Sequence, residues 1–233
     1  MSENQDITEL RSELNELRKE IQMLRDIHDV RTLHFKYGYY LDMCLYDETV
    51  ELFSDDCIVY FLNGIYRGKA GAGRIYKGWF RQMFTQGVNG PVYGFLLDHF
   101  ISQDIVQIAE GGQTAHGRFR CLMQAGSHET KEHKVRPMPD QCWEGGIHEN
   151  VYVKEQGVWK IKELNYNLIW QADYDTGWAH SSVHLEPLTK TYPEDPFGPD
   201  ELAGEIPKFW PNMRVIPFNY PHPVTGEMWK LKP

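Results

Sequence analysis

Three cationic side chains alternate along one short stretch of the sequence, QTAHGRFRC at positions 113–121. In a β-strand, alternate residues share a face, so His116, Arg118 and Arg120 lie on one side and small or apolar residues on the other. Such a face is covered by solvent, by a second subunit, or by a bound molecule. Solvent or an interface is the usual environment of charged side chains. If the face forms the floor of a polar pocket, His116 or Arg118 would stabilise the negative charge of an enolate, a phenolate or an alkoxide.

Two later segments also place polar side chains on single strand faces. His148 and Asn150 share a face of the predicted strand GIHENVYVKE, and Asn165 and Asn167 share a face of VWKIKELNYNLIW. Asparagine is a poor strand former, so its repetition indicates that side-chain amides are needed there. These residues are candidates for binding a polar substrate group.

Metal, nucleotide and thiol chemistry have little support. The histidines of HSSVH, His180 and His184, are four residues apart but lack a carboxylate or cysteine at ligand spacing. GKAGAG (68–73) lacks the Lys-Ser/Thr ending of a phosphate-binding loop, and no dinucleotide, nucleophile-elbow or zinc-protease motif is present. The cysteines show no CxxC spacing and are expected to be small core residues (Cys44, Cys57, Cys121 and Cys142). We therefore expect no metal, no cofactor and a reduced, cytoplasmic protein.

Composition narrows the partners. The chain has 233 residues and a formal charge of −9, which disfavours nucleic acid and anionic membranes, because both bind basic surfaces. No apolar run approaches the length of a membrane span, and the polar start does not resemble a signal peptide. Hydrophobic residues make up 41% and aromatic residues 13%, enough for a packed core and an aromatic pocket. A small aromatic substrate is the expected partner.

The N-terminus carries a heptad pattern of apolar residues (Ile7, Leu10, Leu14, Leu17, Ile21 and Leu24). Glu, Lys and Arg fill the intervening positions, as on a helix that packs along one seam. The pattern is short for an independent coiled coil, so we expect residues 1–24 to form an oligomerisation arm. A homo-oligomer is predicted, with a trimer ahead of a dimer.

The remaining elements follow in the order helices, then strands. The helical pattern continues past residue 25, and a second short helix, DETVELFSDD, follows with Asp47 as a possible N-cap. CIVYFL reads as a strand and AGAGRIYKGWFRQMF as a helix. Strands are predicted at VYGFLLDHFI, SQDIVQIAE and QTAHGRFRCLM, and residues 125–146 read as a long loop before the last two strands. This order predicts an α+β fold with helices on one face of a curved antiparallel sheet.

The segment after residue 172 has a different character. It contains most of the prolines, mixed with aromatic residues, and has neither helical nor strand periodicity. Its aromatic content indicates that it wraps a surface. The predicted organisation is an arm (1–24), a single domain (25–172) and a wrapping tail (173–233).

Three runs together resemble a known family: FKYGYYLDMCLYDETVELFSDDCIVYFLNGIYRG, LLDHFISQDIVQIAEGGQTAHGRFR and YVKEQGVWKIKELNY. In the order and spacing of four motifs, the chain resembles the SnoaL-like polyketide cyclases and dehydratases. The motifs are Tyr-x4-Asp in the first helix, Leu-Phe-Ser-Asp-Asp at the end of the second, a strand histidine, and Gly-x-Trp-Lys-Ile in the last strand. The resemblance covers roughly residues 25–170. It implies the cone-shaped fold named for nuclear transport factor 2.

The resemblance also implies a catalytic pair. In family members with lyase activity an Asp of the first helix and a strand His form a dyad, and these fall on Asp42 and His99, with Tyr37 one turn earlier. An imidazole can accept a proton near neutral pH, while a carboxylate fixes its tautomer. The alternative is that His99 is a core histidine and Asp42 a solvated helix residue. The Arg that several related lyases carry near the end of the last strand is missing, which leaves Arg118 or Arg120 as the candidate anion-stabilising group.

These residues suggest a cofactor-independent lyase acting on a small aromatic molecule. His99 would be the base, Asp42 its orienting partner, and Arg118 would stabilise negative charge. The reaction would be elimination of water, or retro-aldol-like release of formaldehyde from an aryl diol. Similarity to the family's diarylpropane and lignin-derived aromatic lyases implies a lignin-derived diaryl diol as such a substrate. Tyr37 would be a further catalytic residue that orients the substrate or protonates the leaving oxygen. Substrate contacts are expected from Tyr40, Tyr60, Trp79, His116, His148 and Asn165. A polyketide or steroid dehydratase, an isomerase or cyclase, and a non-catalytic binding or assembly module of the same fold stay open as alternatives.

Overall fold

The computed structural model describes residues 2–135, 138–180, 186–206 and 208–230. It confirms the α+β prediction. The helical segments are α1 (Ser2–Asp42), α2 (Tyr46–Glu51), α3 (Gly68–Gly73), the π-helix η1 (Arg74–Phe80) and α4 (Arg81–Thr85). The strands are β1 (Phe53–Phe61), β2 (Gly64–Arg67), β3 (Phe95–Ile108), β4 (Thr114–Ser127), β5 (Gln141–Glu155), β6 (Val158–Asp173) and β7 (Glu201–Leu202).

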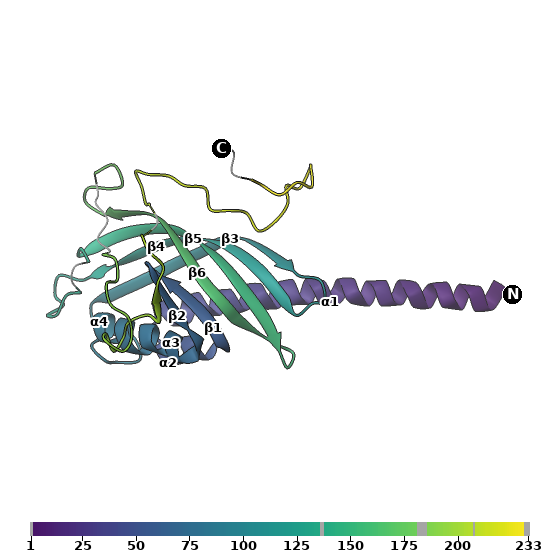
Figure 1. Ribbon diagram of the computed structural model, residues 1–233, viewed down its shortest axis with the longest axis horizontal. Helices are drawn as coiled ribbons and strands as arrows, with labels where there is room; N and C mark the ends of the chain where they lie inside the picture. Colours follow the sequence, from purple (N-terminus) through teal and green to yellow (C-terminus); the bar gives the residue numbers. More distant parts are fainter. Residues whose placement is uncertain (1, 136–137, 181–185, 207, 231–233) are drawn as a thin grey trace.

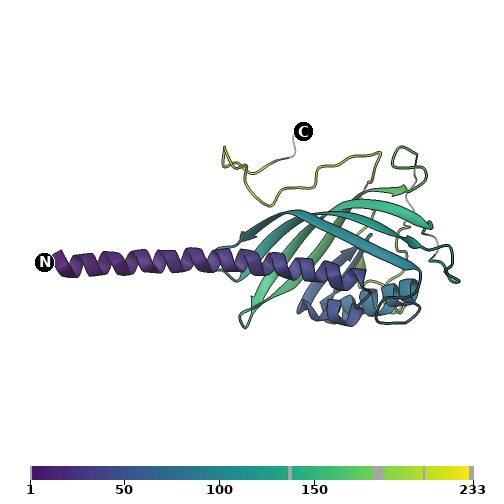
Figure 2. The same ribbon diagram turned by 180° about the vertical axis from the view of Figure 1, so that it is seen from behind.

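One sheet dominates the described part of the chain, in the order β3-β4-β5-β6-β1-β2-β7. The long strands β3 to β6 pair antiparallel and curve, with helices beneath their concave face and the C-terminal tail above their convex face (Figures 1 and 2). β1 pairs with β6 in parallel, and this pairing ends at Tyr60 and Asn165. Because β6 continues to Asp173, its last part has an edge that β1 does not cover.

Helix α1 has two parts with different surroundings. Its first part projects away from the sheet (Figure 1), and the six apolar seam residues predicted there are 47–62% exposed. The second part starts near Asp26, whose carboxylate accepts hydrogen bonds from Lys154 (2.5 Å) and from the Trp159 indole (3.0 Å). From Val30 onward the inner face of the helix is buried against the sheet. The homo-oligomer expected from the seam stays a prediction.

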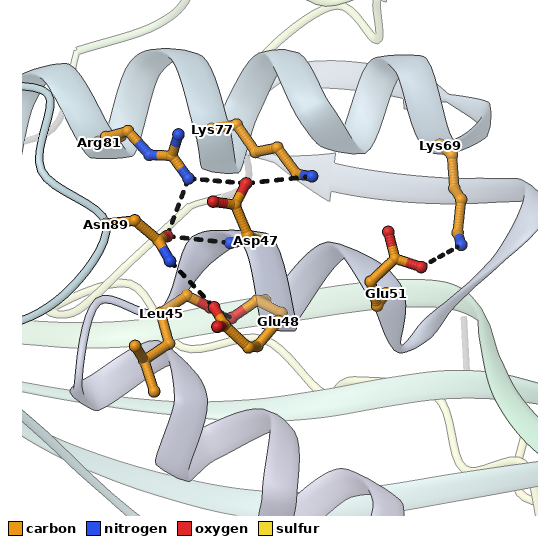
Figure 3. A network of polar contacts seen from close by, with 9 residues as sticks. Leu45, Asp47, Glu48, Glu51, Lys69, Lys77, Arg81 and Asn89 are labelled. Carbon is orange, nitrogen blue, oxygen red and sulfur yellow. Dashed lines mark hydrogen bonds and ion pairs between the residues drawn. The ribbon is translucent and has the colours of Figure 1, made fainter.

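The start of α2 differs from the sequence interpretation. Leu45, not Asp47, occupies the N-cap position, and no side-chain cap bond is made there. The Asn89 side chain instead accepts the Asp47 backbone N–H at 3.0 Å, and the Asp47 carboxylate pairs with Arg81 (2.9 Å) and Lys77 (3.2 Å) (Figure 3). Asp47 therefore links α2 to η1 and α4. This network holds the helical layer together below the sheet.

Two strand boundaries were predicted wrongly. β3 is one strand interrupted by a bulge where Gln103 has a φ of 47°, rather than two strands. The loop predicted for 125–146 is shorter, because β4 continues to Ser127 and β5 begins at Gln141. The glycines that suggested a loop have a packing role: a Cβ on Gly145 would lie 2.1 Å from the Trp170 indole nitrogen. They let aromatic rings lie flat on the strand.

No helix among the described residues combines the length and apolar content needed to cross a membrane.

Candidate active site

An aromatic cavity of about 220 Å³ lies inside the cone, between the concave sheet face and the helices. Its wall includes residues of α1, η1 and α4 and of strands β1 and β3 to β6. Aromatic and aliphatic side chains make up most of this wall (among them Tyr37, Tyr60, Tyr76, Trp79, Phe80, Phe84, Trp143, Tyr166, Leu97 and Met123). Such a lining suits a flat aromatic molecule held by a few polar groups.

The structure brings His99 and Asp42 together. Asp42 is the last residue of α1, and His99 lies on β3, against which α1 packs. The His99 Nδ1 atom is 2.6 Å from Asp42 Oδ1, and the His99 backbone N–H donates to both carboxylate oxygens at 3.2 and 3.1 Å. Both side chains are largely buried, with exposed fractions of 12% and 9%. His99 contributes to the cavity wall, and Asp42 lies behind it.

These bonds select one tautomer of His99. An ionised carboxylate can only accept hydrogen bonds, so Nδ1 carries the proton that Asp42 binds. The other ring nitrogen, Nε2, is then unprotonated and can accept a proton. The backbone bond to the same carboxylate fixes the distance between helix and strand. This is the arrangement that a general base needs: an oriented imidazole with a partner that stabilises its charged form.

The Tyr37 hydroxyl lies on the cavity wall, 2.9 Å from the Tyr76 hydroxyl. Burial raises the pKa of both tyrosines, so both stay protonated. Only one of the two hydroxyls can donate to the other, which leaves one O–H hydrogen for another acceptor. The pair can therefore donate a hydrogen bond to a substrate oxygen.

Glu144 is a site residue that the sequence interpretation missed. It lies directly opposite Met123 of β4, which in turn lies opposite His99 of β3, so all three project from the same sheet face. Glu144 is 8% exposed, lines the cavity and accepts a hydrogen bond from Gln171 at 2.7 Å. Burial raises the pKa of this carboxyl, against smaller opposing effects of the Gln171 hydrogen bond and of the nearby His99. The site thus contains a candidate proton donor two strands away from the candidate base.

Glu144 escaped prediction because it was assigned to the long loop. Only the length of β5, which starts at Gln141, puts it in register with His99. A charged residue beside two glycines gives no strand signal in the sequence. Its one available clue was the neighbouring Trp143, an aromatic residue in an otherwise polar stretch.

His148 supplies a second, uncharged imidazole. It lies on β5, opposite Phe119 of β4 and Tyr166 of β6, and forms part of the cavity wall. Burial, together with the nearby imidazoles of His34 and His99, lowers its pKa well below the ordinary value. Its Nδ1 is buried and makes no hydrogen bond to the described residues. A neutral imidazole with an unused nitrogen is suited to hydrogen-bond a substrate.

The other predicted residues divide into two groups. Tyr60, Trp79 and Asn165 line the cavity, together with Tyr37, His99 and His148. Tyr40, His116 and Arg118 are not part of the described wall.

Arg118 lies on the convex face, where the alternation on β4 puts it. Its guanidinium pairs with Glu149 and donates to the carbonyls of Ile216 and Pro217 at 3.0 and 2.6 Å. It also stacks over the Phe218 ring, 4.4 Å from the centroid. The face is therefore covered by the chain's own tail, which the sequence did not reveal. Arg118 binds the tail rather than the cavity.

A different arginine reaches the cavity. Arg214 of the tail lines the wall, and its Nη2 donates to Asn167 Oδ1 at 3.0 Å. Phe209, also of the tail, lies on the same wall. The tail was predicted to wrap a surface, but nothing in its sequence indicated which of its residues enters the site.

Metal and thiol chemistry gain no support within the described residues. No group of three potential metal ligands is present there, and His184 lies outside them. Burial raises the pKa of Cys57 to about 11 and that of Cys121 to about 12. These cysteines are therefore protonated thiols, which are poor nucleophiles.

The chain belongs to the SnoaL-like domain family. The family's sequence profile matches residues 22–165, which is more than half of the chain and contains Asp42, His99 and Glu144. No protein of curated function matches this sequence.

Several solved structures share the fold. One is a protein from Novosphingobium aromaticivorans provisionally assigned as a scytalone dehydratase, with 22% identity, 71% of this chain and 95% of that chain covered, and a TM-score of 0.53. Another is the type 2 hexachlorocyclohexane dehydrochlorinase LinA, with 15% identity, coverage of 72% and 97%, and a TM-score of 0.53. LinA type 3 from Novosphingobium barchaimii has 13% identity, coverage of 72% and 99%, and a TM-score of 0.52. At these identities the likeness establishes the cone fold alone.

Proposed function

We propose that this protein is a lyase that eliminates a small leaving group from an aromatic substrate bound in the cone, using only its own side chains. The observation that carries the proposal is the 2.6 Å contact between His99 Nδ1 and Asp42 Oδ1 at the wall of an aromatic cavity. Solved proteins of similar fold whose names denote a dehydratase and dehydrochlorinases are consistent with elimination chemistry.

In a dehydration, His99 Nε2 takes a proton from the carbon next to the one that bears the hydroxyl group. The electrons of that C–H bond form the new C=C bond, and the C–O bond breaks. The departing oxygen takes a proton from Glu144, or from the hydroxyl pair of Tyr37 and Tyr76, and leaves as water. A proton then passes from His99 back to the donor, which restores the enzyme.

Loss of formaldehyde from a diol needs the same groups. His99 takes the proton of the primary hydroxyl, the C–C bond breaks, and the CH₂–O unit leaves as formaldehyde. The released electron pair forms a C=C bond with the neighbouring carbon as the hydroxyl on that carbon leaves as water, protonated by Glu144. Both reactions balance without an external oxidant or reductant. Lignin-derived diaryl diols have the required arrangement of groups, and their two rings suit an aromatic wall.

The test is a mass-resolved screen. Purified protein is incubated with aryl diols, diarylpropanes, hydroxylated polyketides and steroids, and products are compared for wild type and His99→Ala. We expect loss of one water, or of one formaldehyde together with one water, in wild type only. The matched control is His116→Ala, which removes a histidine outside the cavity wall and is expected to keep full activity.

Other outcomes identify the alternatives. A product of unchanged mass that requires His99 would indicate an isomerase or a cyclase. Tight binding of a panel member without any conversion, unaffected by His99→Ala, would contradict the proposal and favour a binding module.

A further inference from the structure

The C-terminal tail occupies the part of β6 that β1 leaves uncovered. The Trp210 backbone N–H donates to the Ile169 carbonyl at 2.8 Å, four residues past the end of the β1–β6 pairing. The Trp210 indole donates to the Trp178 carbonyl at 2.6 Å. Phe209 next to it forms part of the cavity wall. The tail therefore covers an edge at which the cone would otherwise be open.

Arg214 follows on this covered edge. Its Nη2 uses one N–H on the Asn167 amide oxygen at 3.0 Å. Its Nε is buried and makes no hydrogen bond to any described residue. Its one polar contact within the described residues is the neutral Asn167 amide, and burial lowers its pKa. The side chain as a whole is only partly buried, but its Nε–H is shielded from water without an acceptor, which is costly, and an anion beside it would satisfy that donor.

The surroundings limit the kind of anion. Arg214 is the only Arg or Lys that lines the cavity in the described part of the chain. One positive charge matches a monoanion, and a carboxylate can accept at once from Nε–H and from the second N–H of Nη2. Asn167 lies four residues from Gln171 along β6, and Gln171 is opposite Glu144. Asn167, which holds the guanidinium, is thus roughly 13 Å along the strand from the residue opposite Glu144.

Arg118 holds the tail close to this position. Its bonds to the Ile216 and Pro217 carbonyls fix the backbone two and three residues beyond Arg214. Ile216 is 6% exposed, so the tail is packed there rather than loosely attached.

We propose that Arg214 is an anion-binding residue and that the cavity prefers aromatic molecules with a carboxylate at the end remote from His99. This inference rests on the proposed function for the aromatic nature of the substrate. The Arg214 contact itself would act in binding and not in proton transfer, so it would change affinity more than turnover.

Binding of two matched probes tests the proposal. Biphenyl-4-carboxylate and biphenyl-4-carboxamide have similar shapes and differ in charge. Their affinities for the full chain are measured by calorimetry, supported by quenching of the fluorescence of cavity residues Trp79 and Trp143. Wild type should bind the carboxylate about tenfold or more tightly than the amide, as expected for a charge-assisted hydrogen bond. Arg214→Gln should abolish this preference while binding the amide as before.

The control variant is Lys208→Gln, which removes an exposed cation from the same tail. It should keep the wild-type preference. Equal affinities for the two probes in wild type, no binding of the carboxylate, or an unchanged preference in Arg214→Gln would each overturn the proposal. The probes are not turned over, so the two proposals can fail separately. If the carboxylate preference depends on Arg214 but the protein is inactive throughout the mass screen, only the lyase proposal is refuted. Activity on neutral substrates without such a preference would refute the anion site alone.

Discussion

The concave and convex faces of strands β3 to β6 alternate residue by residue along the same chain, yet they have different partners. The concave face meets the helices and the cavity, and it presents His99, Glu144 and His148. The convex face meets the proline-rich tail, which Arg118 binds through two carbonyls. Polar residues on the concave face line the cavity, whereas the cation on the convex face holds the tail. Residue type alone does not separate these roles, because both faces carry histidine or arginine.

Among substitutions on the concave face, Asp42→Asn is expected to lower activity most. The amide keeps the size of the side chain but removes the charge that stabilises a protonated His99 and can favour the other tautomer. We expect kcat to fall by about 10³–10⁴-fold, the size of effect seen when the carboxylate partner of a catalytic histidine is replaced. Steady-state kinetics on the substrate found in the screen measures it. An activity within a few-fold of wild type, with an unchanged circular dichroism spectrum, would argue against the dyad.

Glu144→Gln is expected to lower kcat by about 10²–10³-fold, as for loss of a general acid. Because burial raises the pKa of Glu144, the carboxyl stays protonated to a higher pH than an exposed one. The rate of wild type should therefore decline as the pH rises through that pKa, when the donor proton is lost. A pH profile of kcat should lose this alkaline decline in Glu144→Gln. If the decline persists unchanged, another group donates the proton.

On the convex face, Arg118→Ala should act through the tail. We expect faster cleavage of the tail in limited proteolysis and a loss of carboxylate preference, with kcat changed by about tenfold or less. Glu149 loses its partner and is left buried, so some stability is lost as well. Arg120→Ala is the matched control, since Arg120 lies on the same face but is exposed and contacts Gln103. Equal proteolysis of the two variants would contradict the anchoring role of Arg118.

The smallest effect on activity is expected from removing residues 1–24. This part of α1 projects away from the cone (Figure 1), and none of its apolar seam residues lines the cavity. Turnover should stay within about twofold, as for changes remote from a site. Size-exclusion chromatography with light scattering should show a smaller assembly, because the exposed seam suits a subunit contact. An unchanged assembly would remove the arm from the oligomer interface.

The sequence predicted those parts of the molecule that depend on local pattern. Alternation on β4 separated Arg118 from the small and apolar residues of that strand, although the catalytic role expected for Arg118 was wrong. Tyr37 and Asp42 were expected from the family resemblance. The sequence could not predict parts that depend on long-range register. Glu144 faces His99 only because β5 starts at Gln141 and pairs with β4 in one register.

The tail shows the same limit. A segment without periodicity carries no signal for which residue turns inward, so Arg214 could not be distinguished from the other cations. The hydrogen bond of Trp210 to β6, which places it, is a backbone contact and independent of side-chain type.

The central claim is that His99 and Asp42 act as one unit in proton transfer. The most direct measurement is a double-mutant cycle of kcat/KM with His99→Gln, Asp42→Asn and the double variant, all checked for folding. Our account predicts that the double variant is no slower than His99→Gln alone, because Asp42 acts only through the imidazole. Losses that multiply would show that the two residues act independently and would contradict it.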